Sequence, residues 1–117
     1  MPDTIVVLVT CASRAEAGRL ARVLVEKRLA ACVNVSGVPV HSVYRWKGKV
    51  ETAREWLLIV KSTKRRFAAL RQEIARLHSY EVPEVIALTI AAGSAAYLGW
   101  LEESVRPVHK EKSRRKR

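Results

Sequence analysis

The order of hydrophobic patterns along the chain restricts its fold more than any other feature. Residues 4–10 are β-branched and apolar almost throughout, which predicts a strand covered on both faces or central in a sheet. The remaining regular segments follow in a fixed order: a helix over 14–28, strands over 29–43 and 50–61, a helix over 64–77 and a strand over 85–90. The sequence therefore predicts the order β-α-β-β-α-β.

This order predicts a ferredoxin-like α+β sandwich. Crossover connections are right-handed, so both helices fall on one face of a four-stranded antiparallel sheet, whose first strand lies between the third and the fourth. Ser13 is the predicted N-cap of the first helix, and Glu16 completes a capping box. Thr63 is expected to cap the second helix, and Ser94 a short C-terminal helix that Pro107 stops.

The two middle strands should form a long hairpin closed by the turn 46–49. Gly37 and Pro39 interrupt the first of them, so we expect a bulge or bend there and an edge position. Exposed on such an edge, Trp46 and Trp56 would promote aggregation, whereas packed against another subunit they would anchor an interface. The hairpin thus favours an oligomer.

Charge divides the chain into a domain over 1–106 and a basic tail over 107–117. The formal net charge is +11, and six of the cations lie in the tail against only Glu111. We expect a disordered tail that binds polyanions weakly at most. Nucleic acid is not an expected partner, because the tail has no interleaved aromatic residues and the domain has no base-reading motif.

The two cysteines, Cys11 and Cys32, belong to no CxxC motif and to no Cys/His group of zinc-finger spacing. The expected strand order separates them, which argues against a disulfide within one subunit. Neither a signal peptide nor a membrane span is visible. A cytoplasmic protein with reduced thiols and no membrane partner is the prediction.

Several motifs resemble the CutA family of divalent-cation tolerance proteins in order and spacing. They span residues 5 to 105 and read LVEKRLAACVN at 24–34, SVYRWKGK at 42–49, Glu55 before LLIVK at 57–61, HSYEVPE at 78–84 and YLGW at 97–100. The resemblance implies a fold similar to that of PII signalling proteins, a tight homotrimer with sheets extended between subunits by the hairpin, proposed copper binding, and no enzymatic activity. Ser79 and Leu77 depart from the family pattern, where proline and a second histidine are common.

His78, Cys11 and Cys32 are the metal-ligand candidates. Imidazole is a common ligand for copper and zinc, and thiolates suit monovalent copper. A structural alternative accompanies each residue: His78 would close the second helix, and the cysteines would be small buried apolar residues. No metal is expected to be essential.

A set of polar and aromatic residues is assigned to a binding cleft or to a subunit interface. Its members are Tyr44, Trp46, Glu55, Lys61, Tyr80, Glu84, Tyr97 and Trp100. Aromatic residues with a polar end suit either place, and a buried Glu55 or Lys61 would need a partner. The leading hypothesis is a trimeric protein that binds copper or another divalent metal. The alternative is a PII-like trimer that binds a small molecule or an anion, with no direct metal site.

Overall fold

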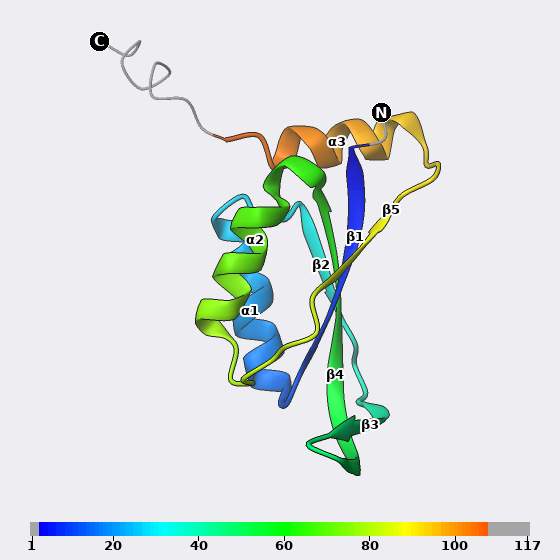
Figure 1. The fold of residues 1–117 in the computed structure, drawn as a ribbon. Helices are drawn as coiled ribbons and strands as arrows, with labels where there is room; N and C mark the ends of the chain where they lie inside the picture. The colour runs from blue at the N-terminus through cyan, green and yellow to red at the C-terminus, as the bar shows by residue number, and fades with distance from the viewer. Residues whose placement is uncertain (1–2, 108–117) are drawn as a thin grey trace, which may run out of the picture.

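The computed structural model describes residues 3–107, which form one sheet with two helices against one of its faces (Figure 1). The elements are β1 (Thr4–Cys11), α1 (Arg14–Glu26), β2 (Cys32–Val35), β3 (Val40–Trp46), β4 (Lys49–Thr63), α2 (Lys64–Leu77), β5 (Ile86–Thr89) and α3 (Ala95–Ser104). The α+β prediction is confirmed, as is the antiparallel order β2-β4-β1-β5. The residues predicted to form a basic tail lie, apart from Pro107, outside the described part of the chain.

The sheet has five strands, so the prediction of four was wrong. The segment expected as one strand is divided into β2 and β3, which both pair with β4 but in different registers. Ser36 still pairs with Leu57 through its backbone N–H (2.9 Å), whereas Val40 faces Glu55. Three residues around Gly37 therefore oppose the single residue Trp56. This bulge explains why a sequence pattern read as continuous gives two strands.

The core lies between the sheet and the paired helices. Odd-numbered residues of β1 and the even-numbered residues 58–62 of β4 face α1 and α2, and their side chains are almost fully buried together with Leu24, Leu70 and Ile74 of the helices. Trp56 packs against this core. Trp56 is only partly buried, so a contact of Trp56 or of Trp46 with another subunit stays a prediction.

The helix caps agree only partly with the sequence. Ser13 Oγ accepts a hydrogen bond from the Glu16 N–H (3.1 Å), as predicted. The capping box was wrong, because the Glu16 carboxylate points away and accepts from Ser79 instead. Thr63 occupies the N-cap position of α2 without a side-chain cap hydrogen bond. Ser94 caps α3 through the Tyr97 N–H (3.3 Å), and α2 ends before His78 as expected.

The second face of the sheet is not covered by α1 or α2. Val6 and Leu8 of β1 point to it, as do Ile86 and Leu88 of β5, which are 50% and 51% exposed. The β3–β4 hairpin projects beyond the body of the subunit (Figure 1), with Val43 and Val50 also exposed. Within residues 3–107 no helix is long and apolar enough to cross a membrane. The chain thus presents a sheet face with exposed apolar residues of β5, and an extended hairpin.

Candidate functional site

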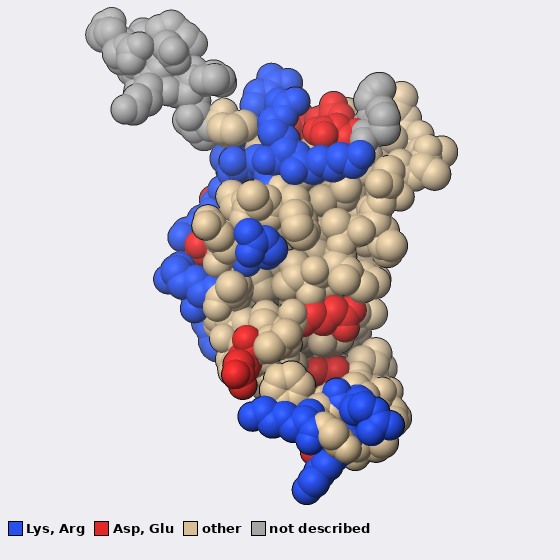
Figure 2. All heavy atoms as spheres, viewed as in Figure 1, with Lys and Arg blue, Asp and Glu red and all other residues tan. Residues whose placement is uncertain are grey.

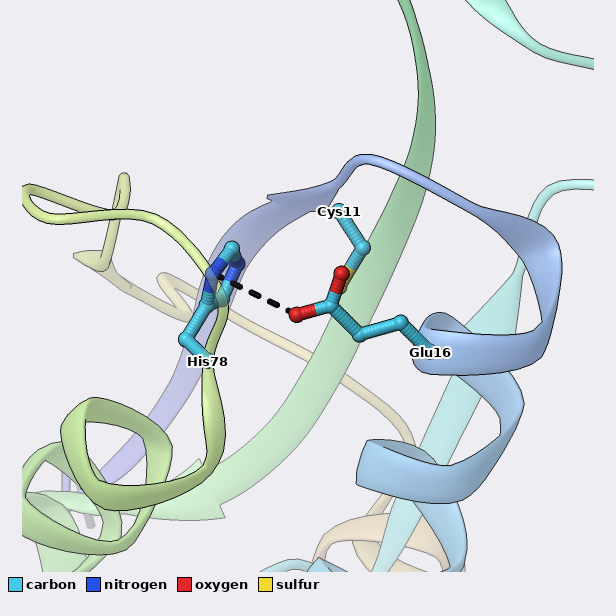
Figure 3. Close-up of side chains that lie close together, drawn as sticks. All are labelled: Cys11, Glu16 and His78. Atoms are coloured by element: carbon cyan, nitrogen blue, oxygen red, sulfur yellow. Dashed lines mark ion pairs between the residues drawn. The ribbon is translucent and has the colours of Figure 1, made fainter.

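Cys11, Glu16 and His78 lie close together near the C-terminal end of β1, where the loop after α2 begins (Figure 3). One thiol, one carboxylate oxygen and one ring nitrogen lie within 4.8 Å of one another, and all three residues are buried. Two of the predicted metal candidates are therefore adjacent. Cys32 lies on the opposite face of the sheet, because it pairs with Lys61 whereas Cys11 pairs with Trp56.

Both ring nitrogens of His78 already have hydrogen-bond partners. Nε2 lies 2.8 Å from the carbonyl oxygen of Thr10, and Nδ1 lies 3.0 Å from the backbone nitrogen of Tyr80. A carbonyl only accepts and an N–H only donates, so these partners assign a neutral ring that is protonated on Nε2. Through these two hydrogen bonds, His78 connects the loop after α2 to the end of β1.

Glu16 holds the same loop from the other side. Its two oxygens accept from the Ser79 N–H (2.8 Å) and from the Ser79 hydroxyl (3.0 Å). Oε2 also lies 3.6 Å from Nδ1 of His78, the contact drawn in Figure 3. The carboxylate thus satisfies a backbone donor that would otherwise be left without a partner beside the core.

Cys11 completes the group as a protonated thiol. Burial, followed by the charges of Glu16 and Glu55, raises the pKa of Cys11 to about 12. The donor types and the spacing of the three residues suit a divalent ion of intermediate softness. Their present hydrogen bonds and protonation do not, because the thiol is protonated and neither His78 nitrogen has a free lone pair. We therefore describe Cys11, Glu16 and His78 as the anchor of the loop.

Cys11 is expected to resist alkylation in the native protein. A pKa of about 12 leaves about 10⁻⁴ of the thiol as thiolate at pH 8, and the side chain is fully buried. Iodoacetamide treatment followed by peptide mass spectrometry should find Cys11 unmodified in buffer and modified in denaturant. Native modification of Cys11 at the rate of a free thiol would show that the anchor is open.

A cleft of about 680 Å³ lies immediately next to the anchor. The β3–β4 hairpin forms one wall and the loop after α2 forms the other, with Thr10 between them. Its lining consists of Thr10, Ser42, Val43, Tyr44, Trp46, Glu55, Ser79, Tyr80, Glu81, Val82 and Glu84. Thr10 and Ser79 also bond to the anchor, so His78 and Glu16 set the position of the loop wall.

The cleft is acidic although the chain is basic. Its lining contains Glu55, Glu81 and Glu84 and no Lys, Arg or His, within a chain of net charge +11. In Figure 2, acidic groups appear in the lower half of the view just above the hairpin, and basic groups follow the α1–α2 side and both ends of the molecule. The local field therefore favours positively charged ligands.

Glu55 is the innermost of these carboxylates. It is 7% exposed, and its Oε2 accepts a hydrogen bond from the Tyr80 hydroxyl at 2.7 Å. Burial and this hydrogen bond raise the pKa of Tyr80 well above its usual value. The hydroxyl consequently stays protonated and donates to Glu55, which joins the two walls of the cleft.

The predicted site residues separate into two groups. Tyr44, Trp46, Glu55, Tyr80 and Glu84 line the cleft, but Lys61, Tyr97 and Trp100 lie elsewhere. Lys61 hydrogen-bonds to Asn34 and lies 4.0 Å from Cys32 Sγ, and the Tyr97 and Trp100 rings are 5.4 Å apart. Burial, and then the neighbouring Cys32, raise the pKa of Tyr97. The shared sheet face of Glu55 and Lys61 therefore does not bring them together.

Sequence reasoning missed Glu16 as a site residue and did not single out Ser79 and Glu81 within the motif 78–84. Glu16 was attributed to a capping box because its spacing from Ser13 fits one. Its real partner, Ser79, is 63 residues away in the chain. The available signal was the acidic pair Glu81 and Glu84 next to His78 and Tyr80, which marks an unusually polar loop in a basic chain.

Comparison with known proteins identifies the family of this chain. The sequence pattern of the family described as "CutA1 divalent ion tolerance protein" matches residues 5–104. The chain belongs to this family. A "Divalent-cation tolerance protein CutA" of Thermus thermophilus is 49% identical over 100 residues, covering 85% of this chain and 95% of that protein. Its counterpart in Archaeoglobus fulgidus is 41% identical over 99 residues, covering 85% and 95%.

Solved CutA structures share the fold as well. CutA1 from Oryza sativa superimposes with a TM-score of 0.85 at 44% identity, covering 90% of this chain and 95% of that one. The names of CutA relatives include "chloroplastic" for a rice protein and "periplasmic" for the Archaeoglobus fulgidus structure. The cytoplasmic location of this chain stays a prediction.

Proposed function

We propose that this CutA protein is a homotrimeric, non-enzymatic cation-binding protein, and that copper or another divalent ion binds in the cleft. The observation that carries the proposal is the cleft lining, which has three carboxylates and no basic side chain in a chain of net charge +11. The names of the relatives, which refer to divalent-cation tolerance, support the same ligand class.

The acidic lining also bears on the PII-like alternative. An anion in this cleft would meet Glu55, Glu81 and Glu84 without a counter-charge, which raises the free energy of binding. A small molecule remains compatible with the cleft when it is positively charged. The anion-binding version of the alternative therefore has no support in this geometry.

The open face of the sheet supports the self-association part of the proposal. Ile86 and Leu88 are about half exposed there, next to Val6 and Leu8, and the hairpin exposes Val43 and Val50. Exposed apolar residues grouped on one face of a sheet support an interaction site there. A trimer built on it would cover the sheet face of each subunit and place the hairpin against a neighbour.

The anchor is a second candidate site for a metal ion. Among residues 3–107 it is the only group of His, Cys and acidic side chains whose ligand atoms lie close enough together to surround one ion. Binding would displace the Tyr80 N–H or the Thr10 carbonyl from His78 and release the thiol proton of Cys11. The spacing favours this site, and the existing hydrogen bonds oppose it.

Calorimetric titration with Cu²⁺, Zn²⁺ and Mn²⁺ tests the proposal. We expect the Glu81→Gln/Glu84→Gln double variant, which removes two carboxylates, to weaken binding by at least about tenfold, which corresponds to about 1.4 kcal/mol in total. Glu26→Gln, which removes an exposed carboxylate on α1, should leave binding unchanged. Absence of binding by all three ions sinks the proposal. If the cleft variants bind the ion as wild type does, but Cys11→Ser does not bind it, the ion binds at the anchor and not in the cleft.

A further inference from the structure

We propose that the ligand class best matched by the cleft is an aliphatic organic cation with two or more ammonium groups. This inference rests on the proposed function, because it takes the cleft to be a cation site. It goes further in naming the distribution of charge and the shape that the cleft recognises.

The spacing of the carboxylates is the first reason. Glu55, Glu81 and Glu84 do not form a group whose oxygens could surround one ion together, in contrast to the anchor residues. They come from different segments, since Glu55 is on β4 and the others are on the loop after α2. Carboxylates distributed along a cleft can each contact a separate positive charge, so a ligand with several ammonium groups can contact more of them than a single ion does.

The walls of the cleft supply the second reason. Tyr44, Trp46 and Tyr80 contribute aromatic surface, and Val43 and Val82 contribute apolar surface. Ammonium groups are attracted to aromatic faces, and methylene chains are stabilised on apolar walls. The volume of about 680 Å³ is within the range typical of small-molecule sites.

The arrangement of Glu55 supplies the third reason. Its Oε2 is fixed by the Tyr80 hydroxyl, whereas Oε1 has no hydrogen-bond partner among residues 3–107. Every buried side-chain oxygen of residues 3–107 has a hydrogen-bond partner. Because Oε1 has none, it is not buried, and it is accessible from the cleft that Glu55 lines. A carboxylate that is 7% exposed, held in place and left with one free acceptor provides a preorganised contact for an ammonium N–H.

Titration of the full chain with spermidine at fixed ionic strength tests this inference. We expect saturable binding that is weakened about tenfold by Glu55→Gln, which keeps an acceptor for Tyr80 but removes the charge. Glu84→Gln, at an exposed position with less risk to folding, should weaken binding in the same direction. Glu26→Gln on α1 is the matched control and should not change binding. Butylamine, with one ammonium group, should bind more weakly than spermidine.

A second readout locates the ligand. The indole N–H resonance of Trp46, assigned with Trp46→Phe, should shift on addition of spermidine, whereas that of Trp100 should not, because Trp100 lies with Tyr97 outside the cleft. Spermidine binding that is equal in wild type and in Glu55→Gln and Glu84→Gln would overturn the inference. Binding of Mn²⁺ or Cu²⁺ through the cleft without binding of spermidine would overturn it and leave the proposed function standing. Failure of both ligand classes would overturn both.

Discussion

Replacing His78 by alanine is expected to lower the free energy of unfolding by about 3 kcal/mol in protein treated with chelator. The His78 side chain is fully buried, and its loss leaves the Thr10 carbonyl and the Tyr80 N–H without partners next to an empty space. An imidazole kept only as a vacant metal ligand would contribute little in the absence of metal. Urea denaturation of wild type and variant at equal concentration measures the difference.

His41→Ala provides the matched control for this prediction. His41 lies exposed on β3, so its removal should leave the unfolding free energy nearly unchanged. If the His78→Ala variant treated with chelator were as stable as wild type, the ring would not anchor the loop. Its hydrogen bonds would then have to be replaced by other groups or by water.

Replacing Leu88 by glutamate is expected to dissociate the oligomer. Leu88 is 51% exposed on the open face of the sheet, and burying a carboxylate in an apolar interface costs several kcal/mol for each copy. Multi-angle light scattering at micromolar concentration should give about three times 13.2 kDa for wild type and close to 13.2 kDa for the variant.

Thr89→Glu is the control, because Thr89 is the next residue of β5 and points to the other face of the sheet. It adds the same charge to the same edge strand and should leave the mass at the wild-type value. Dissociation by both variants would indicate that a charge on the edge strand β5 disrupts the oligomer whichever sheet face it points to. A wild-type mass of 13.2 kDa would refute self-association outright.

The sequence predicts the fold well because local patterns determine it. β-Branched runs define β1 and β4, and the spacing of Leu20, Leu24, Leu70 and Ile74 defines the core faces of the helices. The division of β2 from β3 was not predicted as a fifth strand. Gly37 and Pro39 signalled an irregularity, but the number of residues in the bulge depends on the pairing of β4, which no local pattern contains.

The candidate site was predictable only in part, because it is made by contacts between distant segments. Tyr44, Tyr80 and Glu84, which the sequence assigned to a binding cleft or to a subunit interface, line one cleft of this chain. Glu16 has a good local explanation and a different real partner. Tyr97 and Trp100 share a polar-aromatic character with the cleft residues, but Tyr97 lies beside Cys32 and Trp100 lies beside Tyr97. Residue type therefore indicated which side chains are unusual, and only the fold indicates which of them meet.

The anchor and the cleft form one structural unit. His78 and Glu16 hold residues 78–80, and this segment places the Tyr80 hydroxyl on Glu55. Loss of either anchor residue should therefore disturb ligand binding indirectly, by moving the loop wall. An effect of His78 variants on metal response would follow from this geometry without direct coordination.

The most direct test of the cleft as the cation site is a crystal soaked in copper or manganese and examined by anomalous scattering. The account predicts density in the cleft, beside at least one of the carboxylates of Glu55, Glu81 and Glu84. Density between Cys11 Sγ and His78, or no density in the cleft at saturating metal, would contradict it.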